Sequence, residues 1–163
     1  MTPYQRIFGT GPRGIAISTV LLGITWQVDQ IVDLPPISGN GTVRIVSLVV
    51  GCLGALLIAG AATVALPPKA RGTSLVTTGI YRHVRHPIYA SLVSSFNFGL
   101  AIYLDGWLYL AWAVLLHPLW HWNVGGEERM MAAHFPEYPA YTKKTGRFLP
   151  GLFRDQRRPN DSE

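Results

Sequence analysis

Two clusters of opposite charge hold most of the side chains in this sequence that are suited to chemistry. The basic cluster places Arg85 and His86 directly before Pro87, and the acidic cluster is the adjacent pair Glu127 and Glu128. Proline is well tolerated in the first turn of a helix, so we expect Arg85 and His86 at a helix N-terminus. Free amide hydrogens, the helix dipole and the arginine would favour an anion there. The two glutamates, which follow two glycines, are typical of the first turn of another helix.

Together the two clusters would suit a ligand that carries both charges. An amino acid moiety needs an acidic partner for its ammonium group and a basic partner for its carboxylate. A third group of residues could fold over such a ligand as a lid: Tyr138, Tyr141, Lys143, Lys144 and Arg147. Plainer interpretations remain open for all three groups, namely a basic anchor on anionic lipid, a capped interfacial helix and an interfacial anchor for the tail.

No metal site is predicted. His117 and His121 are four positions apart, but no third ligand follows at a helical offset. Trp120 and Trp122 beside them are typical of an interfacial aromatic belt. The single cysteine, Cys52, excludes a disulfide framework within the chain and a metal site built from several cysteines.

Four apolar blocks must position these clusters, and they span residues 15–34, 43–66, 88–104 and 107–122. Only 14% of the 163 residues are charged, and the block lengths bracket the roughly 20 residues that cross a bilayer as a helix. The sequence therefore predicts an all-α, polytopic transmembrane bundle with four or five spans. Only Asp105 and Gly106 separate the last two blocks, which predicts a tight antiparallel hairpin. We expect one domain over 1–153, with its motifs in 73–152, and a polar, flexible tail over 154–163.

The distribution of Lys and Arg predicts the orientation of the bundle. Cytoplasmic loops carry an excess of these residues, and here they occur before the first block, between the second and third, and after the fourth. Four spans with both termini in the cytoplasm, in a prokaryotic inner membrane, satisfy this pattern and bring both charged clusters to one side. The net charge of +5 does not predict nucleic acid binding, because the basic residues flank apolar blocks.

The order of the motifs carries further information. The segment 75–89, a helical hairpin, the pair Glu127 and Glu128, and the segments 135–141 and 147–150 follow one another along about half of the chain. This arrangement resembles the superfamily of isoprenylcysteine carboxyl methyltransferases and phospholipid methyltransferases, which are membrane enzymes. The resemblance implies S-adenosylmethionine as cofactor and S-adenosylhomocysteine as product. It also implies a cofactor pocket on the cytosolic side, covered by a short C-terminal helix. Ile80 departs from the family, which often has proline there.

The resemblance also implies roles for particular residues. The implied cofactor contacts are Thr73, Ser74, Leu75, Val76, Tyr81, Arg85, His86, Pro87, Tyr89, Glu127, Tyr141 and Arg147. His86 and Glu128 are the candidates for a catalytic base, which an amine or thiol acceptor would need and a carboxylate acceptor would not. Asn123 is the candidate substrate contact, because the isoprenylcysteine enzymes have at this position an arginine associated with the substrate carboxylate.

The predicted function is methyl transfer from S-adenosylmethionine to a lipophilic acceptor, which would enter sideways from the lipid bilayer. The acceptor could resemble an isoprenylcysteine carboxylate, a phospholipid amine or a small thiol. Two alternatives stay open: a membrane reductase that uses a nicotinamide cofactor, as sterol reductases with a similar hairpin do, and a lipid-binding membrane protein without enzymatic activity. The two adjacent glutamates and the short chain favour the methyltransferase.

Overall fold

The described residues of this computed structural model, 9–151, form helices joined by loops and one isolated β-bridge. The all-α prediction is confirmed for this part of the chain. The predicted tail, 154–163, lies outside it. The long helical segments are α2 (Gly11–Asp29), α3 (Gly41–Ala65), α6 (Trp107–Asn123) and the continuous run of α4 (Pro87–Ala90), the π-helix η3 (Ser91–Phe96) and α5 (Asn97–Leu104). The shorter elements are η1 (Pro68–Ala70), η2 (Gly79–Arg82), α7 (Gly125–His134) and α8 (Tyr138–Lys144).

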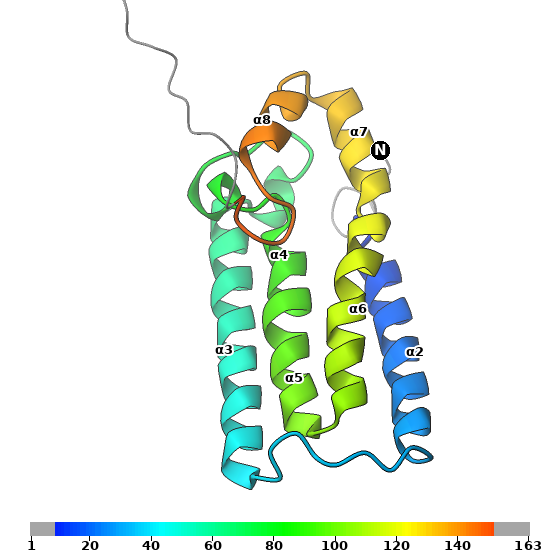
Figure 1. Ribbon diagram of the computed structural model, residues 1–163. Helices are drawn as coiled ribbons and strands as arrows, with labels where there is room; N and C mark the ends of the chain where they lie inside the picture. The colour runs from blue at the N-terminus through cyan, green and yellow to red at the C-terminus, as the bar shows by residue number, and fades with distance from the viewer. Residues whose placement is uncertain (1–8, 152–163) are drawn as a thin grey trace, which may run out of the picture.

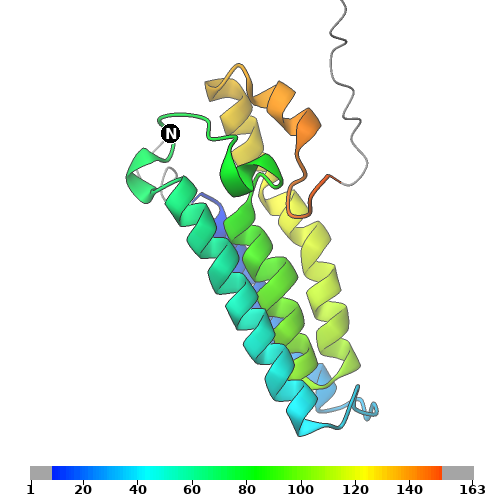
Figure 2. The ribbon, with the colours of Figure 1, turned by 90° about the vertical axis from the view of Figure 1, so that its left-hand side faces the viewer.

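The long helices lie side by side as a bundle, and α7 and α8 cover one end of it (Figure 1). The second view shows α4, η3 and α5 as one continuous rod against α3 (Figure 2). Two helical segments, Gly41–Ala65 and Pro87–Leu104, are long and apolar enough to cross a membrane. Exposed side chains on α3 such as Leu57 and Val64, 74% and 85% accessible, suit contact with lipid. The chain is therefore membrane-associated, whereas four spans and cytoplasmic termini stay predictions.

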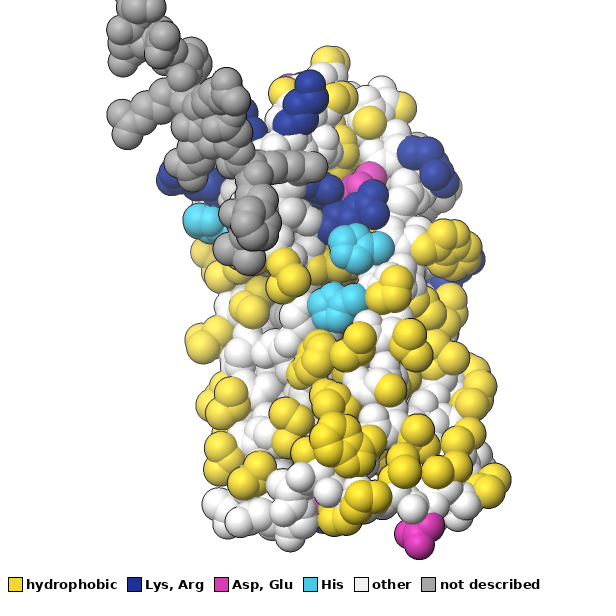
Figure 3. Space-filling model, in the orientation of Figure 1, with side chains coloured by type: hydrophobic (Ala, Val, Ile, Leu, Met, Phe, Trp, Pro, Cys, Tyr) yellow, Lys and Arg dark blue, Asp and Glu magenta, His cyan; other side chains and the backbone are white. Residues whose placement is uncertain are grey.

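Basic side chains gather at the α7 and α8 end of the molecule, and apolar side chains cover the bundle below them (Figure 3). Arg44 is an exception to the expected charge distribution. Its Nε donates to the carbonyl oxygen of Tyr103 at 2.7 Å, so it lies at the far end, beside the hairpin turn. Asp105 makes this turn with a left-handed φ of 63°, and its carboxylate accepts hydrogen bonds from the amides of Ser38 at 2.8 Å and Gly39 at 3.0 Å. The hairpin and the loop between α2 and α3 are thus tied together.

Tryptophans attach α2 to α6. The indole nitrogen of Trp112 donates to the carbonyl oxygen of Ser18 at 3.2 Å, and that of Trp120 donates to the Ser18 hydroxyl at 3.0 Å. Both tryptophans are buried in the core that the bundle encloses. Buried indole N–H groups usually find a partner, and here both find it on one residue of α2. The position of α2 is therefore set by specific contacts.

Small residues allow α3 to approach the rod formed by α4, η3 and α5. A Cβ atom added at Gly51 would lie 2.9 Å from the Cα of Gly99 and 3.0 Å from the carbonyl oxygen of Ser95. Glycines permit such close packing of helices in lipid. Gly60, in the same helix, has nothing within 4 Å of the corresponding position.

These two glycines give a matched test of the packing. We expect G51A to lower the free energy of unfolding by about 1–3 kcal/mol, because the new methyl group meets backbone atoms that cannot move aside. G60A should instead raise it by about 0.5–1 kcal/mol, since alanine is the better helix former and the position is open. Thermal unfolding in detergent measures both. Equal effects of the two substitutions would contradict the close contact.

Candidate functional site

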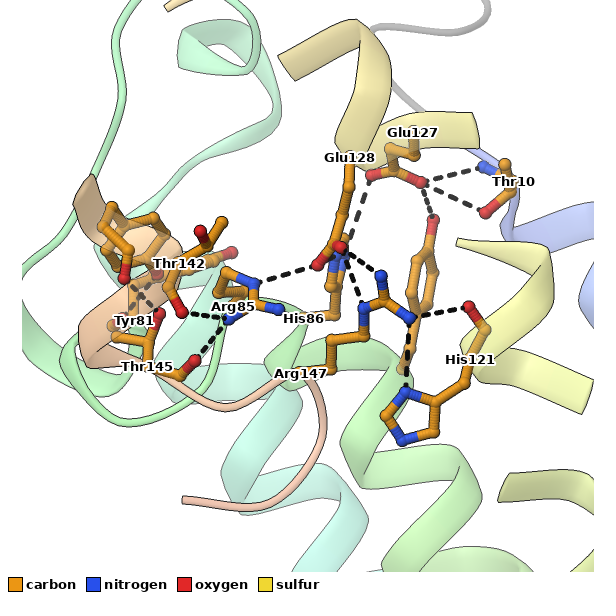
Figure 4. Close-up of polar contacts among 12 residues, drawn as sticks. Thr10, Tyr81, Arg85, His86, His121, Glu127, Glu128, Thr142, Thr145 and Arg147 are labelled. Atoms are coloured by element: carbon orange, nitrogen blue, oxygen red, sulfur yellow. Dashed lines mark hydrogen bonds and ion pairs between the residues drawn. The ribbon is translucent and has the colours of Figure 1, made fainter. Parts of the chain in front are cut away.

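The acidic and basic clusters meet at the covered end of the bundle. Val124 has right-handed helical backbone angles and joins α6 directly to α7, so Gly125 and Gly126 lie in the first turn of α7. His86 is the N-cap of α4, and Pro87 stands in its first turn as expected. As a result, Arg85 Nε lies 2.9 Å from Glu128 Oε1, and His86 Nδ1 lies 4.0 Å from Glu127 Oε1 (Figure 4).

Glu128 is held between two arginines. Arg147 Nη2 lies 2.6 Å and Arg147 Nε 2.8 Å from Glu128 Oε2, opposite the contact with Arg85. Burial raises the pKa of the Glu128 carboxyl, but the nearby His86 and the hydrogen bonds from Arg147 and Arg85 outweigh it and hold the pKa well below its usual range. The geometry therefore argues against Glu128 as a catalytic base, because a carboxylate that stays ionised so strongly is a poor proton acceptor.

Arg85 belongs to the same network of hydrogen bonds and ion pairs around Glu128. Its Nη1 donates to the carbonyl oxygens of Thr142, at 3.2 Å, and Thr145. Sequence analysis assigned this guanidinium to the ligand, but its Nε and Nη1 already bond to Glu128 and to the carbonyls that end α8. Arg147 Nη1 similarly donates to the carbonyl oxygen of His121 at 3.0 Å. Both arginines thus join α7 to the segments that surround it.

The C-terminal segment forms a wall of the site. Val84 and Gly146 make a parallel bridge, and the amide of His86 donates to the carbonyl oxygen of Arg147 at 3.1 Å. The Tyr141 hydroxyl donates to the carbonyl oxygen of Tyr81 at 2.6 Å. Burial raises the pKa of Tyr141 to about 12, so its phenol stays protonated as a donor. These bonds hold the start of α4 against the C-terminal segment.

A cavity of about 310 Å³ opens beside this network. Most of its wall is aromatic or aliphatic. The predicted cofactor contacts that line this cavity are Ser74, Leu75, Val76, Tyr81, Arg85, His86, Pro87, Tyr89, Glu127 and Tyr141. Tyr138 and Met131 also line it, which makes the α7 and α8 segment a cover of the cavity. Burial raises the pKa of Tyr138 as well. A mostly apolar cavity with a few polar groups is the usual form of a small-molecule site.

Thr73, Arg147 and Asn123, which were predicted to contact ligands, do not line this cavity. Thr73 is exposed, and its hydroxyl donates to the carbonyl oxygen of Ala70 at 2.7 Å. Arg147 is engaged by Glu128. The Asn123 side chain is buried, and its Nδ2 donates to the carbonyl oxygen of Thr10 at 3.1 Å.

Glu127 differs from Glu128 in its partners. Its Oε2 accepts hydrogen bonds from the amide and the hydroxyl of Thr10 and from the hydroxyl of Tyr89, each at 3.2 Å. Among the residues described, no Lys or Arg nitrogen is paired with it within 4.0 Å. A carboxylate held by uncharged donors keeps its charge for another partner. Among the described residues, Glu127 is thus the carboxylate of this cavity that has no Lys or Arg partner.

His86 is the buried base candidate of the cavity. Its ring is parallel to that of Tyr89, with centroids 5.6 Å apart. Its Nε2 lies 3.4 Å from Glu128 Oε1 but has no hydrogen bond of acceptable geometry. Buried polar atoms without a partner are rare in folded proteins and need a reason.

Sequence analysis missed the contribution of the start of α2. Gly9, Gly11, Pro12 and Ile15 line the cavity, and Thr10 binds Glu127. The glycines at positions 9, 11 and 14 are a signal of close backbone approach, whereas the prediction for this segment rested only on its charge.

Replacing Glu128 tests the network. We expect E128Q to lower the free energy of unfolding near pH 7 by about 3 kcal/mol, because two arginines lose their ionised partner in a largely buried place. A carboxyl with a depressed pKa stabilises the fold above its unfolded pKa, and this contribution is lost as the pH falls toward the folded pKa. The difference in unfolding temperature between wild type and E128Q should therefore shrink at about pH 3. The exposed Glu137 supplies the control, E137Q. A difference that does not change with pH would contradict the ionised pairing.

Comparisons with known proteins find a family match within the chain. Residues 68–138 match the model of the phospholipid methyltransferase family, a range that contains the hairpin and both glutamates. The nickel-cobalt-cadmium resistance protein NccN of Alcaligenes xylosoxydans xylosoxydans is 35% identical over 92 residues, which are 53% of this chain and 41% of that protein. The chain thus spans less than half the length of this relative. The described residues hold no group of three or more His, Cys, Asp or Glu side chains arranged for a metal ion. No solved structure matches the chain.

The family match and the helical hairpin between the two clusters agree with the resemblance drawn from the motifs. Residues 68–138 are thus similar to the phospholipid methyltransferase family, one of the two families that the motifs resemble.

Proposed function

We propose that this protein is an integral membrane methyltransferase that binds S-adenosylmethionine in the 310 Å³ cavity and methylates a lipophilic acceptor. The observation that carries the proposal is Glu127, whose carboxylate lines an otherwise mostly apolar cavity and is paired with no Lys or Arg among the described residues. Such a group suits the ammonium of an amino acid moiety. The same carboxylate disfavours ligands that present only anionic groups.

The remaining wall suits the other parts of the cofactor. Aromatic rings from Tyr81, Tyr89, Tyr138 and Tyr141 line the cavity, and aromatic faces attract cations such as a sulfonium. Leu75, Val76 and Met131 offer an apolar surface to a nucleobase. Arg71 also lines the cavity and adds positive potential that favours a ligand carboxylate.

The bound sulfonium supplies an already activated methyl group. The protein then has to align the acceptor and exclude water, and alignment of two reactants can lower a barrier by roughly 7 to 11 kcal/mol. We assign His86 as the base where the acceptor carries a proton, because its buried Nε2 lacks a hydrogen bond and its ring lines the cavity. Glu128 is assigned to positioning Arg85 and Arg147.

A second cavity supports a lipophilic acceptor. It has a volume of about 160 Å³ and lies between α2, η3 and α6, with lining from Ile15, Ser18, Thr19, Leu22, Leu92, Phe96, Asn97, Trp112 and Trp120. Ile15 and Leu92 also line the first cavity. An apolar chain in the second cavity would therefore bring its polar end to the first. This arrangement suits entry of the acceptor from the bilayer, with the termini and the cofactor site on the cytoplasmic side.

Cofactor binding tests the proposal directly. Calorimetric titration of the purified full chain with S-adenosylhomocysteine should show binding, and titration with NADPH should show none. We expect E127Q to weaken binding by about 10- to 100-fold, the cost of a hydrogen bond to a charged group. The exposed Glu137 gives the matched control E137Q, which should bind like wild type. Binding of NADPH alone would favour the reductase, and binding of neither would favour a protein without enzymatic activity.

The acceptor route is tested with methyl-labelled S-adenosylmethionine and a total membrane lipid extract. Label should move to a lipid-soluble product. T19W should reduce transfer at least several-fold without changing the affinity for S-adenosylhomocysteine, because Thr19 lines the second cavity and not the first. Thr63 is an exposed threonine on α3, so T63W is the matched control. Undiminished transfer by T19W would exclude this route.

A further inference from the structure

Thr10 connects two helices through every polar group it has. Its amide and its hydroxyl both donate to Glu127 Oε2 at 3.2 Å, and its carbonyl oxygen accepts from Asn123 Nδ2 at 3.1 Å. Glu127, which accepts the first two bonds, belongs to α7, and Asn123, which donates the third, is the last residue of α6. Figure 4 shows the Glu127 carboxylate turned toward Thr10. One residue at the start of α2 thus spans the junction of α6 and α7.

The backbone around Thr10 approaches its partners too closely for side chains. Gly9 has a left-handed φ of 54°, and a Cβ added there would lie 2.5 Å from Glu127 Oε2 and 2.7 Å from the Tyr89 hydroxyl. A Cβ added at Gly14 would lie 2.6 Å from the Trp120 ring. Glycine removes both obstacles and permits the positive φ. The segment 9–14 is therefore shaped to bring Thr10 to the carboxylate.

The attachment of α2 to α6 does not depend on the ligand site. The two indole hydrogen bonds to Ser18 lie further along the helix, in the core of the bundle. A side chain on a helix fixed in this way is held more precisely than one on a free loop. Thr10 consequently presents its donors to Glu127 from a defined position.

The three donors occupy only one oxygen of the carboxylate. The amide and hydroxyl of Thr10 and the hydroxyl of Tyr89 donate to Oε2, whereas Oε1 lies 4.0 Å from His86 Nδ1. Since the side chain lines the cavity, fixing Oε2 leaves Oε1 as the oxygen for a ligand donor. The rotation of the carboxylate, and with it the direction of its free lone pairs, depends on Thr10.

We infer that Thr10 is a positioning residue for ligand binding, which acts by orienting the Glu127 carboxylate toward the ammonium group of the bound amino acid moiety. This inference rests on the proposed function and goes beyond the matched segment, because Thr10 lies outside residues 68–138. It makes the start of α2 part of the binding site.

The test compares two ligands that differ in the amino acid moiety. S-adenosylhomocysteine carries the ammonium group, and 5′-methylthioadenosine lacks the whole moiety. T10V should weaken binding of the first by about tenfold, the lower range for a hydrogen bond to a charged group, and leave binding of the second within twofold. T10S should restore wild-type affinity because it keeps the hydroxyl. Thr63 donates only to the carbonyl oxygen of Ala59 in its own helix, so T63V is the control.

Each outcome decides the inference. Unchanged affinity of T10V for S-adenosylhomocysteine overturns it, and an equal loss for both ligands overturns it in favour of a general structural role. If T10V does not fold, G9A replaces it, since the added methyl group displaces the segment from Glu127 while Thr10 stays present. Wild type that binds neither ligand overturns the proposed function itself, and this inference with it.

Discussion

The ion triad of Glu128 with Arg85 and Arg147 is the interaction on which the rest of the site depends. Charges in a largely buried place must be paired, because desolvation costs several kcal/mol for each ion. Here one carboxylate serves two guanidiniums that come from different segments, the loop before α4 and the segment after α8. The triad therefore ties α7, the loop before α4 and the segment after α8 to one another beside the cavity. Both arginines are paired with Glu128, so among the described residues the neighbouring Glu127 has no arginine partner.

Local signals predicted the parts of this arrangement that local chemistry decides. Pro87 marked the start of a helix, Asp105 and Gly106 marked the hairpin turn, and the long apolar blocks marked the bundle. The different partners of the two glutamates could not be predicted from such local signals. They are adjacent and chemically identical, and which one meets the arginines depends on the rotation of α7 and on the bridge between Val84 and Gly146. Both are set by contacts between distant parts of the chain.

The two cavities meet where the helix geometry changes. The π-helix η3 carries Leu92, which lines both cavities, and Phe96, which lines the second. Single π-helical turns inside α-helices occur frequently at functional sites. In a membrane bundle, backbone groups must be satisfied within the protein, so a local change of helical register is a permitted way to redirect side chains. The position of η3, directly after the residues that contact the glutamates, joins the polar site to the apolar one.

The start of α2 shows how a segment without a recognisable motif can complete a site. Thr10 and Glu127 are 117 positions apart, so no pattern along the chain relates them. The matched segment supplies the carboxylate, the histidine and the hairpin, but two of the three donors to Glu127 Oε2 come from Thr10. Without Thr10, Tyr89 is the one donor to Oε2 that remains among the described residues, and the carboxylate could rotate about its last bonds. A fixed charge binds a ligand with less loss of entropy than a mobile one. The start of α2 therefore holds one oxygen of the Glu127 carboxylate as well as enclosing the cavity.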